Sequence, residues 1–524
     1  MTAGNADMAT GSASTNAAGN AGRTGWITLS IMMATIMQTV DTTIANVALP
    51  HMQGSLNATQ DQVSWVLTSY IVACAIMTAP TGMLAARFGR KRVFLVSVTG
   101  FTLTSVLCGL AQNLPEMVIF RLLQGVFGAG LVPLSQAVLL DTYPKEKHGQ
   151  AMSMWAMGVM LGPIIGPTLG GWLTEYYNWR WVFYINVPFG IVTLMGIWVF
   201  MPETERDRDR RFDTFGFAML ALSIGALQLL LDRGQGEDWL ESTEIVTEIV
   251  VAGLAFYLFV VHILTTDKPF LEPALFRDRN YVASLGFIFV VGIILLGSMA
   301  LLPPFLQGLM GYPVITTGIV LAPRGLGSMF AMLVAGRLIS RIDPRLIMLT
   351  GLLLAAWSLH EMSLFTTEVS SWDVIRNGFI QGMGMGCMFV PLSTLAYSTL
   401  APRFRNDAAS VFSLIRNIGS SVGISVVTTL LARSTQVNHA ELGAHLVNYG
   451  VRGNLIDAVV AQSSGTESAD TLQMLNNMVN QQAATIAYLN DFRLMMIVVL
   501  MTSPLLLLLR GQETTAPSQT EPAH

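Results

Sequence analysis

The sequence predicts an all-α membrane protein with fourteen transmembrane helices, and two observations support this. Hydrophobic residues make up 52% of the 524-residue chain and charged residues only 12%, with a mean hydropathy of +0.54. Soluble proteins carry about a quarter charged residues, so most of this surface must face lipid. The second observation is a series of apolar runs of membrane-spanning length, about 20 residues each, separated by short polar breaks.

Taken in order, the apolar runs place the spans at 26–49, 62–85, 93–112, 116–140, 150–173, 181–201, 214–232, 244–265, 281–303, 315–336, 346–365, 373–398, 410–432 and 491–509. The expected units are a disordered tail, a six-helix bundle, two additional helices with their linkers, a second six-helix bundle and a short tail, at 1–25, 26–201, 202–280, 281–509 and 510–524. The first tail is rich in Ser, Thr, Asn, Ala and Gly and lacks the basic and apolar regions of a signal peptide.

The placement of Lys and Arg orients the spans. With both termini in the cytoplasm, most of the 29 basic residues fall in loops on the cytoplasmic side, as the positive-inside rule requires. The inverted topology violates that bias in nearly every loop. We therefore expect a multi-pass protein of the bacterial inner membrane with both termini cytoplasmic.

One connection is much longer than the others. Residues 433–490 are polar and rich in Asn and Gln, and they lie outside the membrane on the periplasmic side in this topology. A connection of this length is usually functional or disordered. Because 471–489 has helical apolar spacing, we expect partial order.

The fourth and twelfth spans share a similar sequence pattern. An arginine, Arg121 or Arg376, precedes a Gln-Gly pair, and a Pro-Leu-Ser stretch follows in both spans. This is the pattern of two related halves with a binding cavity between them, a transporter architecture.

Several further motifs occur in a fixed order, at 40–50, 82–92, 121–125, 158–171, 178–188, 231–235, 323–325 and 416–419. Together they resemble the fourteen-helix drug:proton antiporter branch of the major facilitator superfamily, the EmrB/QacA type, over residues 26–510. The resemblance implies a major facilitator fold with two six-helix bundles plus two extra helices, and proton-coupled export by alternating access. The chain departs from the family's loop motif at Ala86, where an acid is usual, so a gating role for that carboxylate does not carry over.

Asp41 is the first candidate for proton coupling. It lies about 12 Å from the outer end of its span at 1.5 Å per residue, where a carboxylate is costly unless paired, protonated or wetted by a cavity. Arg121 lies at similar depth, and Gln124, Gly125 and Gly128 share its helix face. We expect Arg121 to bias the protonation of a nearby acid such as Asp41. The alternative is a fixed pair that only holds helices together.

Two further motifs have structural rather than chemical interpretations. Glycines recur every fourth residue in the fifth span with two prolines among them, which predicts a close helix contact, a hinge and a sealing surface, at Gly158, Gly162, Pro163, Gly166, Pro167 and Gly170. The loop after the second span predicts a cytoplasmic gate, although the positive-inside rule also explains its charges. Its residues are Gly82, Arg87, Gly89, Arg90 and Lys91.

Three other groups of residues are considered for a role as a proton site, a ligand site or a metal site. His360 and Glu361 are a possible second proton site, with plain surface exposure as the alternative. Arg324 and Arg376 are expected to be buried ion pairs rather than substrate ligands. Cys74, Cys108 and Cys387 all fall within spans and predict neither a disulfide framework nor a metal cluster.

Export of amphipathic or toxic compounds is the function that the sequence favours. We find no nucleotide-binding loop, metal-ligand set or catalytic triad, so we expect no enzyme activity, no catalytic residue and no cofactor, and the net charge of −4 gives no reason to expect nucleic acid binding. The alternatives are a dedicated exporter of one metabolite and a non-transporting sensor or scaffold. EmrB-like relatives work with a periplasmic adaptor of the EmrA type and an outer-membrane channel, whereas QacA-like relatives act alone; the loop 433–490 is the expected docking surface.

Overall fold

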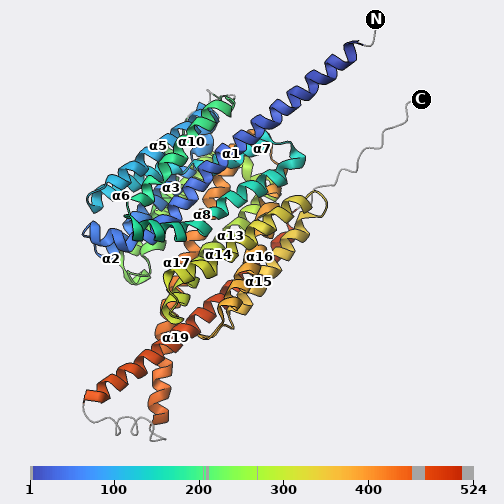
Figure 1. Ribbon diagram of the computed structural model, residues 1–524. Helices are drawn as coiled ribbons and strands as arrows, with labels where there is room; N and C mark the ends of the chain where they lie inside the picture. The colour runs from blue at the N-terminus through green and yellow to red at the C-terminus, as the bar shows by residue number, and fades with distance from the viewer. Residues whose placement is uncertain (1–3, 205, 208–211, 268, 451–465, 510–524) are drawn as a thin grey trace.

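The computed structural model describes residues 4–204, 206–207, 212–267, 269–450 and 466–509, and this part of the chain is almost entirely helical (Figure 1). Within it, twelve helices are long and apolar enough to cross a membrane, and α3 with α4, bent by 53° at their break, forms a thirteenth span when counted as one. The predicted span 346–365 corresponds to α15 (Pro344–Met362), whose ends carry Arg345 and Glu361 and are therefore more polar. The predicted all-α, fourteen-helix membrane fold agrees with this architecture.

The N-terminal half contains six spans, three of which are broken once. The second span breaks before Pro80, which lacks a backbone donor, the fourth at Ala129 and the sixth at Ile185. The elements are α1 (Gly4–Ser55), α2 (Gln60–Val63), α3 (Trp65–Thr78), α4 (Thr81–Phe88), α5 (Arg90–Leu110), α6 (Leu114–Gly128), α7 (Leu131–Thr142), η1 (Lys145–Lys147), α8 (His148–Tyr176), α9 (Trp181–Tyr184) and α10 (Asn186–Phe200).

The two additional spans follow this half. They are α11 (Thr214–Arg233) and α12 (Thr243–Thr265), with η2 (Trp239–Glu241) between them and η3 (Pro273–Arg277) after them. Helix α11 packs against α3 and also against α17 of the C-terminal half. Asp232 of α11 accepts a hydrogen bond of 2.5 Å from Thr68 of α3. Helix α11 therefore covers one side of the seam between the two halves, and α12 packs against α11.

The C-terminal half repeats the arrangement with α13 (Arg279–Pro304), η4 (Phe305–Leu309), α14 (Val314–Leu338), α15, α16 (Ser371–Ser398), η5 (Pro402–Phe404), α17 (Arg405–Gly450), α19 (Thr466–Met501) and η6 (Ser503–Leu507). On the other side of the seam, α14 packs along α8 of the N-terminal half. A Cβ atom at Gly336 would lie 2.6 Å from the Ser153 Cβ. Small residues thus bring the two halves into close contact.

Helices α17 and α19 extend past the bundle as a pair (Figure 1). Helix α17 has 46 residues, about 69 Å at 1.5 Å per residue, against about 30 Å for the hydrocarbon core. The helix predicted at 471–489 is confirmed within α19. Helix α17 continues past 432, where its membrane span is predicted to end, because no glycine or proline occurs from 424 to 442 to end the helix. Residues 451–465 of the predicted loop lie outside the described residues.

The beginning of α1 and the end of η6 lie at one end of the bundle, opposite the extension of α17 and α19 (Figure 1). Helix α1 begins at Gly4, ahead of the span predicted from residue 26. The disorder expected for 1–25 and the unit boundaries remain predictions, and the predicted tail 510–524 lies outside the described residues.

Candidate functional site

Asp41 of α1 is the centre of a buried polar cluster in the N-terminal half. Its side chain is 0% exposed. Arg121 of α6 donates to Oδ2 at 2.9 Å, Gln124 donates to Oδ1 at 3.0 Å, and Asn186 of α10 donates to Oδ1 at 2.7 Å. Both carboxylate oxygens are therefore engaged, which offsets the cost of a charge at this depth.

Arg121 supplies the positive charge of the cluster and is also fully buried. Its Nε donates to the Val66 carbonyl at 3.0 Å, and its Nη1 donates to Gln124 Oε1 at 2.8 Å as well as to Asp41. The guanidinium carbon lies 4.3 Å from the centre of the Tyr70 ring, within cation–π range. Its Nη2 has no hydrogen-bond partner within the described residues. The predicted proximity of Arg121 and Asp41 is confirmed.

Close helix packing and a relay of hydrogen bonds hold this cluster in place. A Cβ atom at Gly125 would lie 2.9 Å from the Ala73 Cβ, so this glycine lets α6 approach α3 closely. The Asn186 amide also donates to Ser105 Oγ at 2.9 Å, and that hydroxyl donates to the Phe183 carbonyl at 2.9 Å. These bonds fix the side chain that holds Asp41, although the sequence motifs gave Asn186 no role.

The glycine motif of α8 packs against α1, the helix that carries Asp41. A Cβ atom at Gly162 would lie 2.6 Å from the Thr39 backbone carbon. Thr43 Oγ1 donates to the Gly162 carbonyl at 3.0 Å. Gly158, Gly166 and Gly170 also face residues of α1, and Pro163 and Pro167 lie within a continuous helix. The motif therefore makes the predicted close contact; its role as a hinge remains a prediction.

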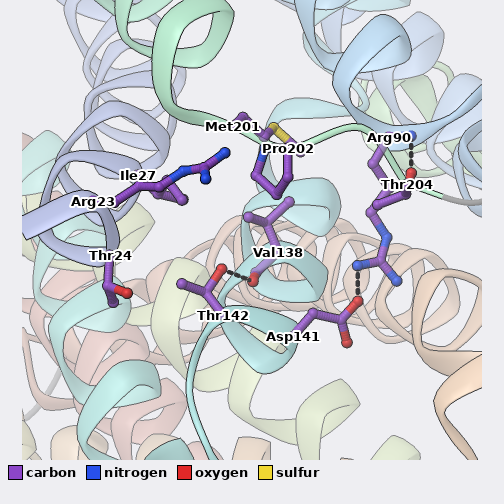
Figure 2. Close-up of a pocket in the computed structure, with 10 residues that line it drawn as sticks. All are labelled: Arg23, Thr24, Ile27, Arg90, Val138, Asp141, Thr142, Met201, Pro202 and Thr204. Atoms are coloured by element: carbon purple, nitrogen blue, oxygen red, sulfur yellow. Dashed lines mark hydrogen bonds and ion pairs between the residues drawn. The ribbon is translucent and has the colours of Figure 1, made fainter. Parts of the chain in front are cut away.

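A latch of ion pairs joins the halves at one end of the seam. Asp141 of α7 pairs with Arg90 of α5 and with Arg405 of α17. Arg90 Nε also donates to Asn406 Oδ1 at 2.6 Å, across the seam. Figure 2 shows Arg90 and Asp141 in the wall of a cavity of about 260 Å³, which is also lined by Arg23, Thr24, Ile27, Val138, Thr142, Met201, Pro202 and Thr204.

Helix α4 lies beside this latch and contacts the other half. A Cβ atom at Gly82 would lie 2.6 Å from Asp407 Oδ1 on α17, so the glycine permits contact between the halves. At Ala86, where the family usually has an acid, the backbone carbonyl accepts a hydrogen bond from the Asp207 amide at 3.0 Å. A carboxylate that forms an ion pair across the seam here is Asp141.

The remaining residues of the predicted gate make contacts within the N-terminal half. Gly89 has φ +91°, a left-handed conformation that favours glycine. Lys91 Nζ donates to the Trp198 carbonyl at 2.7 Å. The Arg87 guanidinium lies over the Phe88 ring. Of the five residues, Gly82 and Arg90 are the ones brought against the other half.

Polar side chains from both halves also meet at mid-seam. Tyr397 of α16 donates to Gln136 Oε1 of α7 at 3.3 Å, and Gln38 Nε2 of α1 lies 3.7 Å from Cys74 Sγ of α3. Arg416 belongs to α17, which packs against α3 and α7 of the N-terminal half. Gln38, Gln136, Cys74, Tyr397 and Arg416 are called the seam layer below.

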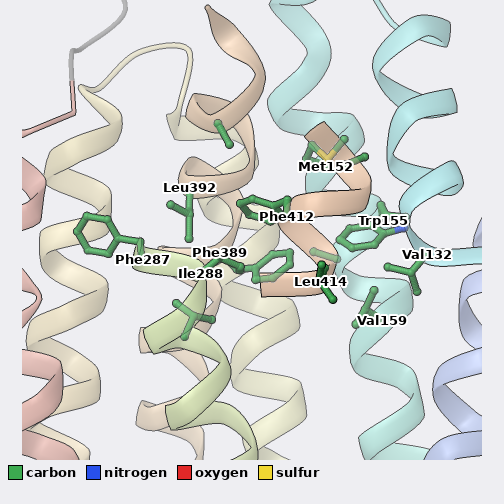
Figure 3. Packing of buried hydrophobic residues seen from close by; sticks show 14 of the residues in the cluster. Val132, Met152, Trp155, Val159, Phe287, Ile288, Phe389, Leu392, Phe412 and Leu414 are labelled. Carbon is green, nitrogen blue, oxygen red and sulfur yellow. The ribbon is translucent and has the colours of Figure 1, made fainter. Parts of the chain in front are cut away.

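The seam also contains an apolar contact between the halves and unused hydrogen-bonding atoms. Trp155 of α8 stacks on Phe389 of α16 with ring centres 6.0 Å apart, as Figure 3 shows. Within the described residues, Gln38 Oε1, Gln136 Nε2 and the Trp155 indole nitrogen are buried without a partner. Buried polar atoms are usually satisfied, so these atoms indicate a place where a polar group of a ligand could bind.

The two residues of the possible second proton site differ in their exposure and in their contacts. His360 is exposed, whereas Glu361 accepts a hydrogen bond from Asn377 Nδ2 at 2.9 Å and pairs with Arg376 at 3.3 Å. Arg376 is 51% exposed, so the expectation of a buried pair is wrong for it: its helix, α16, begins only a few residues earlier, at Ser371.

Arg324 also departs from the prediction. Its Nη2 donates to Ser298 Oγ at 2.7 Å and to the Leu295 carbonyl at 3.4 Å, and it forms no ion pair with a described carboxylate. The expected buried pair is therefore absent in the described chain. The described residues also contain no cluster of three or more His, Cys, Asp or Glu suited to a metal ion.

The chain folds into two helical halves with a polar seam between them, and one half holds a buried charge cluster. This arrangement defines the class as a major facilitator transporter fold. The model of the Major Facilitator Superfamily matches residues 31–424, so the chain belongs to this family. The structure is similar to that of a proton:xylose symporter, with a TM-score of 0.57 and 13% identity over 91% of this chain and 95% of the symporter chain, a likeness in fold alone.

Curated relatives narrow the branch to the EmrB type. The chain is 36% identical to a fatty acid resistance protein of Neisseria gonorrhoeae, FarB, over 87% of this chain and 90% of the relative. It is 36% identical to the multidrug export protein EmrB of Haemophilus influenzae, over 81% of this chain and 83% of the relative. The resemblance drawn from the sequence motifs is confirmed.

Proposed function

We propose that this chain exports small amphipathic or toxic compounds across the inner membrane in exchange for protons, by alternating access. The observation that carries the proposal is the fully buried carboxylate of Asp41, held by Arg121, Gln124 and Asn186. A helical scaffold has no need of a charge at that depth, whereas an antiporter needs a group that binds and releases a proton.

In the proposed cycle, a proton from outside binds the Asp41 carboxylate and removes its charge. The ion pair with Arg121 is then lost, and the guanidinium keeps its cation–π contact with Tyr70. Removing one partner of a buried pair destabilises the arrangement by about 3–5 kcal/mol. This free energy biases the packing of α1, α6 and α10, and release of the proton inside restores the pair.

Movement of the halves completes the cycle. The latch at Asp141 closes one end of the seam, and we assign this end to the cytoplasm because the loops there are rich in Lys and Arg. Opening requires that the Asp141–Arg405 pair break and that α8 separate from α14. Substrate then enters the seam layer from the cytoplasm, and it leaves on the other side after the latch has closed again.

The extension of α17 and α19 is the proposed docking surface for a periplasmic adaptor, which would connect the transporter to an outer-membrane channel. The two helices are held together outside the bundle by Asn438, which donates to the Ala483 carbonyl at 3.2 Å, and by His439 beside Asn476 at 3.1 Å. Val437, Met474 and Met478 expose apolar side chains there. These contacts support a rigid platform for a protein partner.

The test is proton movement in liposomes that contain the purified protein. A pH gradient is imposed and lipophilic compounds are added one at a time. Antiport predicts that compounds trigger proton flux and that Arg121→Ala abolishes it or changes its pH dependence. An Arg121→Ala variant with wild-type flux and pH dependence would contradict the coupling step, and wild-type protein that moves compounds without protons would contradict antiport.

A further inference from the structure

Asp491 of α19 is a buried carboxyl group that the proposed cycle does not use. Its side chain is 2% exposed, and it lies within a helix that is apolar enough to span the membrane. Its Oδ2 is buried without a hydrogen-bond partner, and no cation of the described residues pairs with it. Asp41, by contrast, accepts hydrogen bonds on both oxygens. An unpaired carboxyl group within a span is costly as an anion, which makes Asp491 a candidate functional group.

Contacts on either side of Asp491 show which element it faces. The Tyr488 ring packs against Phe305, the first residue of η4, with ring centres 5.4 Å apart. The Met495 methyl group would lie 3.4 Å from a Cβ atom at Gly297 of α13. Side chains three and four residues apart share one face of a helix. Asp491 therefore lies on the same face as these two residues and faces α13 between positions 297 and 305.

This stretch of α13 is where the helix loses its regular hydrogen bonds. Pro303 and Pro304 lie within it and have no backbone N–H. The carbonyls of Met299 and Ala300 therefore lack the donor that an α-helix supplies four residues further on. The chain continues as the π-helical turn η4, and such turns are frequent at functional sites. In transporters, the carbonyls of interrupted helices bind protons and Na⁺, so this stretch offers acceptors to a cation or to a protonated carboxyl group.

No charged group on the neighbouring elements balances Asp491. Helix α19 packs against α13, η4, α15, α17 and η6. Residues 282–309, 346–359, 417–432 and 503–507 of these elements contain no Asp, Glu, His, Lys, Arg, Tyr or Cys. None of the titratable groups beyond those ranges or on α19 itself forms a hydrogen bond or ion pair with Asp491 in the described chain. They include His360 and Glu361 of α15, Arg433 and His439 of α17, and Tyr488 and Arg493 of α19.

We propose that Asp491 is a proton-binding site that exchanges its proton with the outer side of the membrane. Helix α13 has 26 residues, about 39 Å at 1.5 Å per residue. Its proline end therefore lies near the outer boundary of a core about 30 Å thick in the expected topology. In the packed arrangement the carboxyl group is protonated, and its O–H donates to a carbonyl of the interrupted turn.

Loss of this proton changes the packing of α19. The carboxylate then repels the carbonyl oxygens of α13 and takes up water, because an ion without a partner is costly in the bundle. Helix α19 loosens from α13 and η4 as a result. The acidity outside thus controls how firmly the base of the α17 and α19 extension is held. This inference goes beyond the proposed export and does not depend on it.

Infrared difference spectra of the purified protein test proton binding directly. Spectra are compared between about pH 9 and about pH 5, a range that covers exposed and buried carboxyl groups, for wild type, Asp41→Asn, Asp491→Asn and the exposed control Glu368→Gln. The proposal predicts a band of a protonated carboxyl group in dry surroundings that Asp491→Asn lacks and the other two variants keep. A spectrum of Asp491→Asn equal to that of wild type would overturn it. A carboxylate band that persists at both pH values and shifts with Na⁺ would overturn the proton in favour of sodium.

Hydrogen exchange of the backbone amides in 305–309 and 484–492 tests the loosening. After correction for the intrinsic rate, wild type should lose protection by about tenfold or more between about pH 5 and about pH 9. Asp491→Asn should keep its protection at both pH values, because its amide can donate to the same carbonyl without releasing a proton. Equal protection of wild type at both pH values would overturn the loosening. An equal loss in Asp491→Asn would overturn the assignment to this residue. Neither measurement involves transport, so a failure of antiport leaves this proposal standing.

Discussion

Replacing Asp141 by Asn should open the latch end of the seam. The wild-type carboxylate pairs with Arg405 across the seam, and its side chain is 36% exposed against 11% for Arg405. A hydrogen bond between charged groups contributes about 1.5–3 kcal/mol when protected from water. Solvent screening reduces this to about 1 kcal/mol here, because a third of the Asp141 side chain is exposed. The open state should therefore become about fivefold more populated.

Cys74 is a native reporter for this change, because it lies at mid-seam and is 7% exposed. With Cys108 and Cys387 replaced by alanine, a membrane-impermeant maleimide applied from the latch side should label Cys74 about fivefold faster in Asp141→Asn than in wild type. Glu203→Gln is the matched control, since Glu203 pairs with Arg206 on the same surface without crossing the seam. Equal labelling rates in all three proteins would refute the latch.

Three further predictions follow from the packing and the cluster. Gly162→Leu should insert normally but lose transport, because overpacking against Thr39 costs about 1–3 kcal/mol; wild-type transport in vesicles would contradict the close contact. Asn186→Ala should lower the melting temperature and shift the pH dependence of transport, since Asp41 loses a hydrogen bond worth about 1–3 kcal/mol; an unchanged pH profile would make Asn186 merely structural. Deleting 440–485 should abolish co-purification of the adaptor while sparing transport in liposomes, and retained adaptor binding would exclude the extension as the docking surface.

Much of the fold could be predicted because membrane spans follow from local composition. The helix positions, the additional pair and the helical stretch at 471–489 all depend on apolar runs and spacing along the chain. The breaks within spans could not be predicted as reliably, since only Pro80 gives a local signal. The continuous α17 was missed because polar composition was taken as the end of a helix, although a helix can continue into water when nothing in its sequence terminates it.

The charged residues of the candidate site could be predicted from the sequence, but the residues that hydrogen-bond to them could not. Asp41 and Arg121 are conspicuous because charges are rare in spans, and their pairing is confirmed. Asn186 and Gln136 are neutral residues whose importance comes from what lies opposite them in space. The single signal for them in the sequence is an amide side chain within an apolar run.

The central claim is tested most directly by measuring proton flux in liposomes that contain either the wild-type protein or the Asp41→Asn variant. The asparagine keeps the size of the side chain and removes the group that binds a proton. Antiport through Asp41 predicts substrate-triggered proton flux in wild type and none in the variant, with both proteins folded. Undiminished flux in Asp41→Asn would contradict the assignment and move the proton site elsewhere, with Glu361 the next candidate.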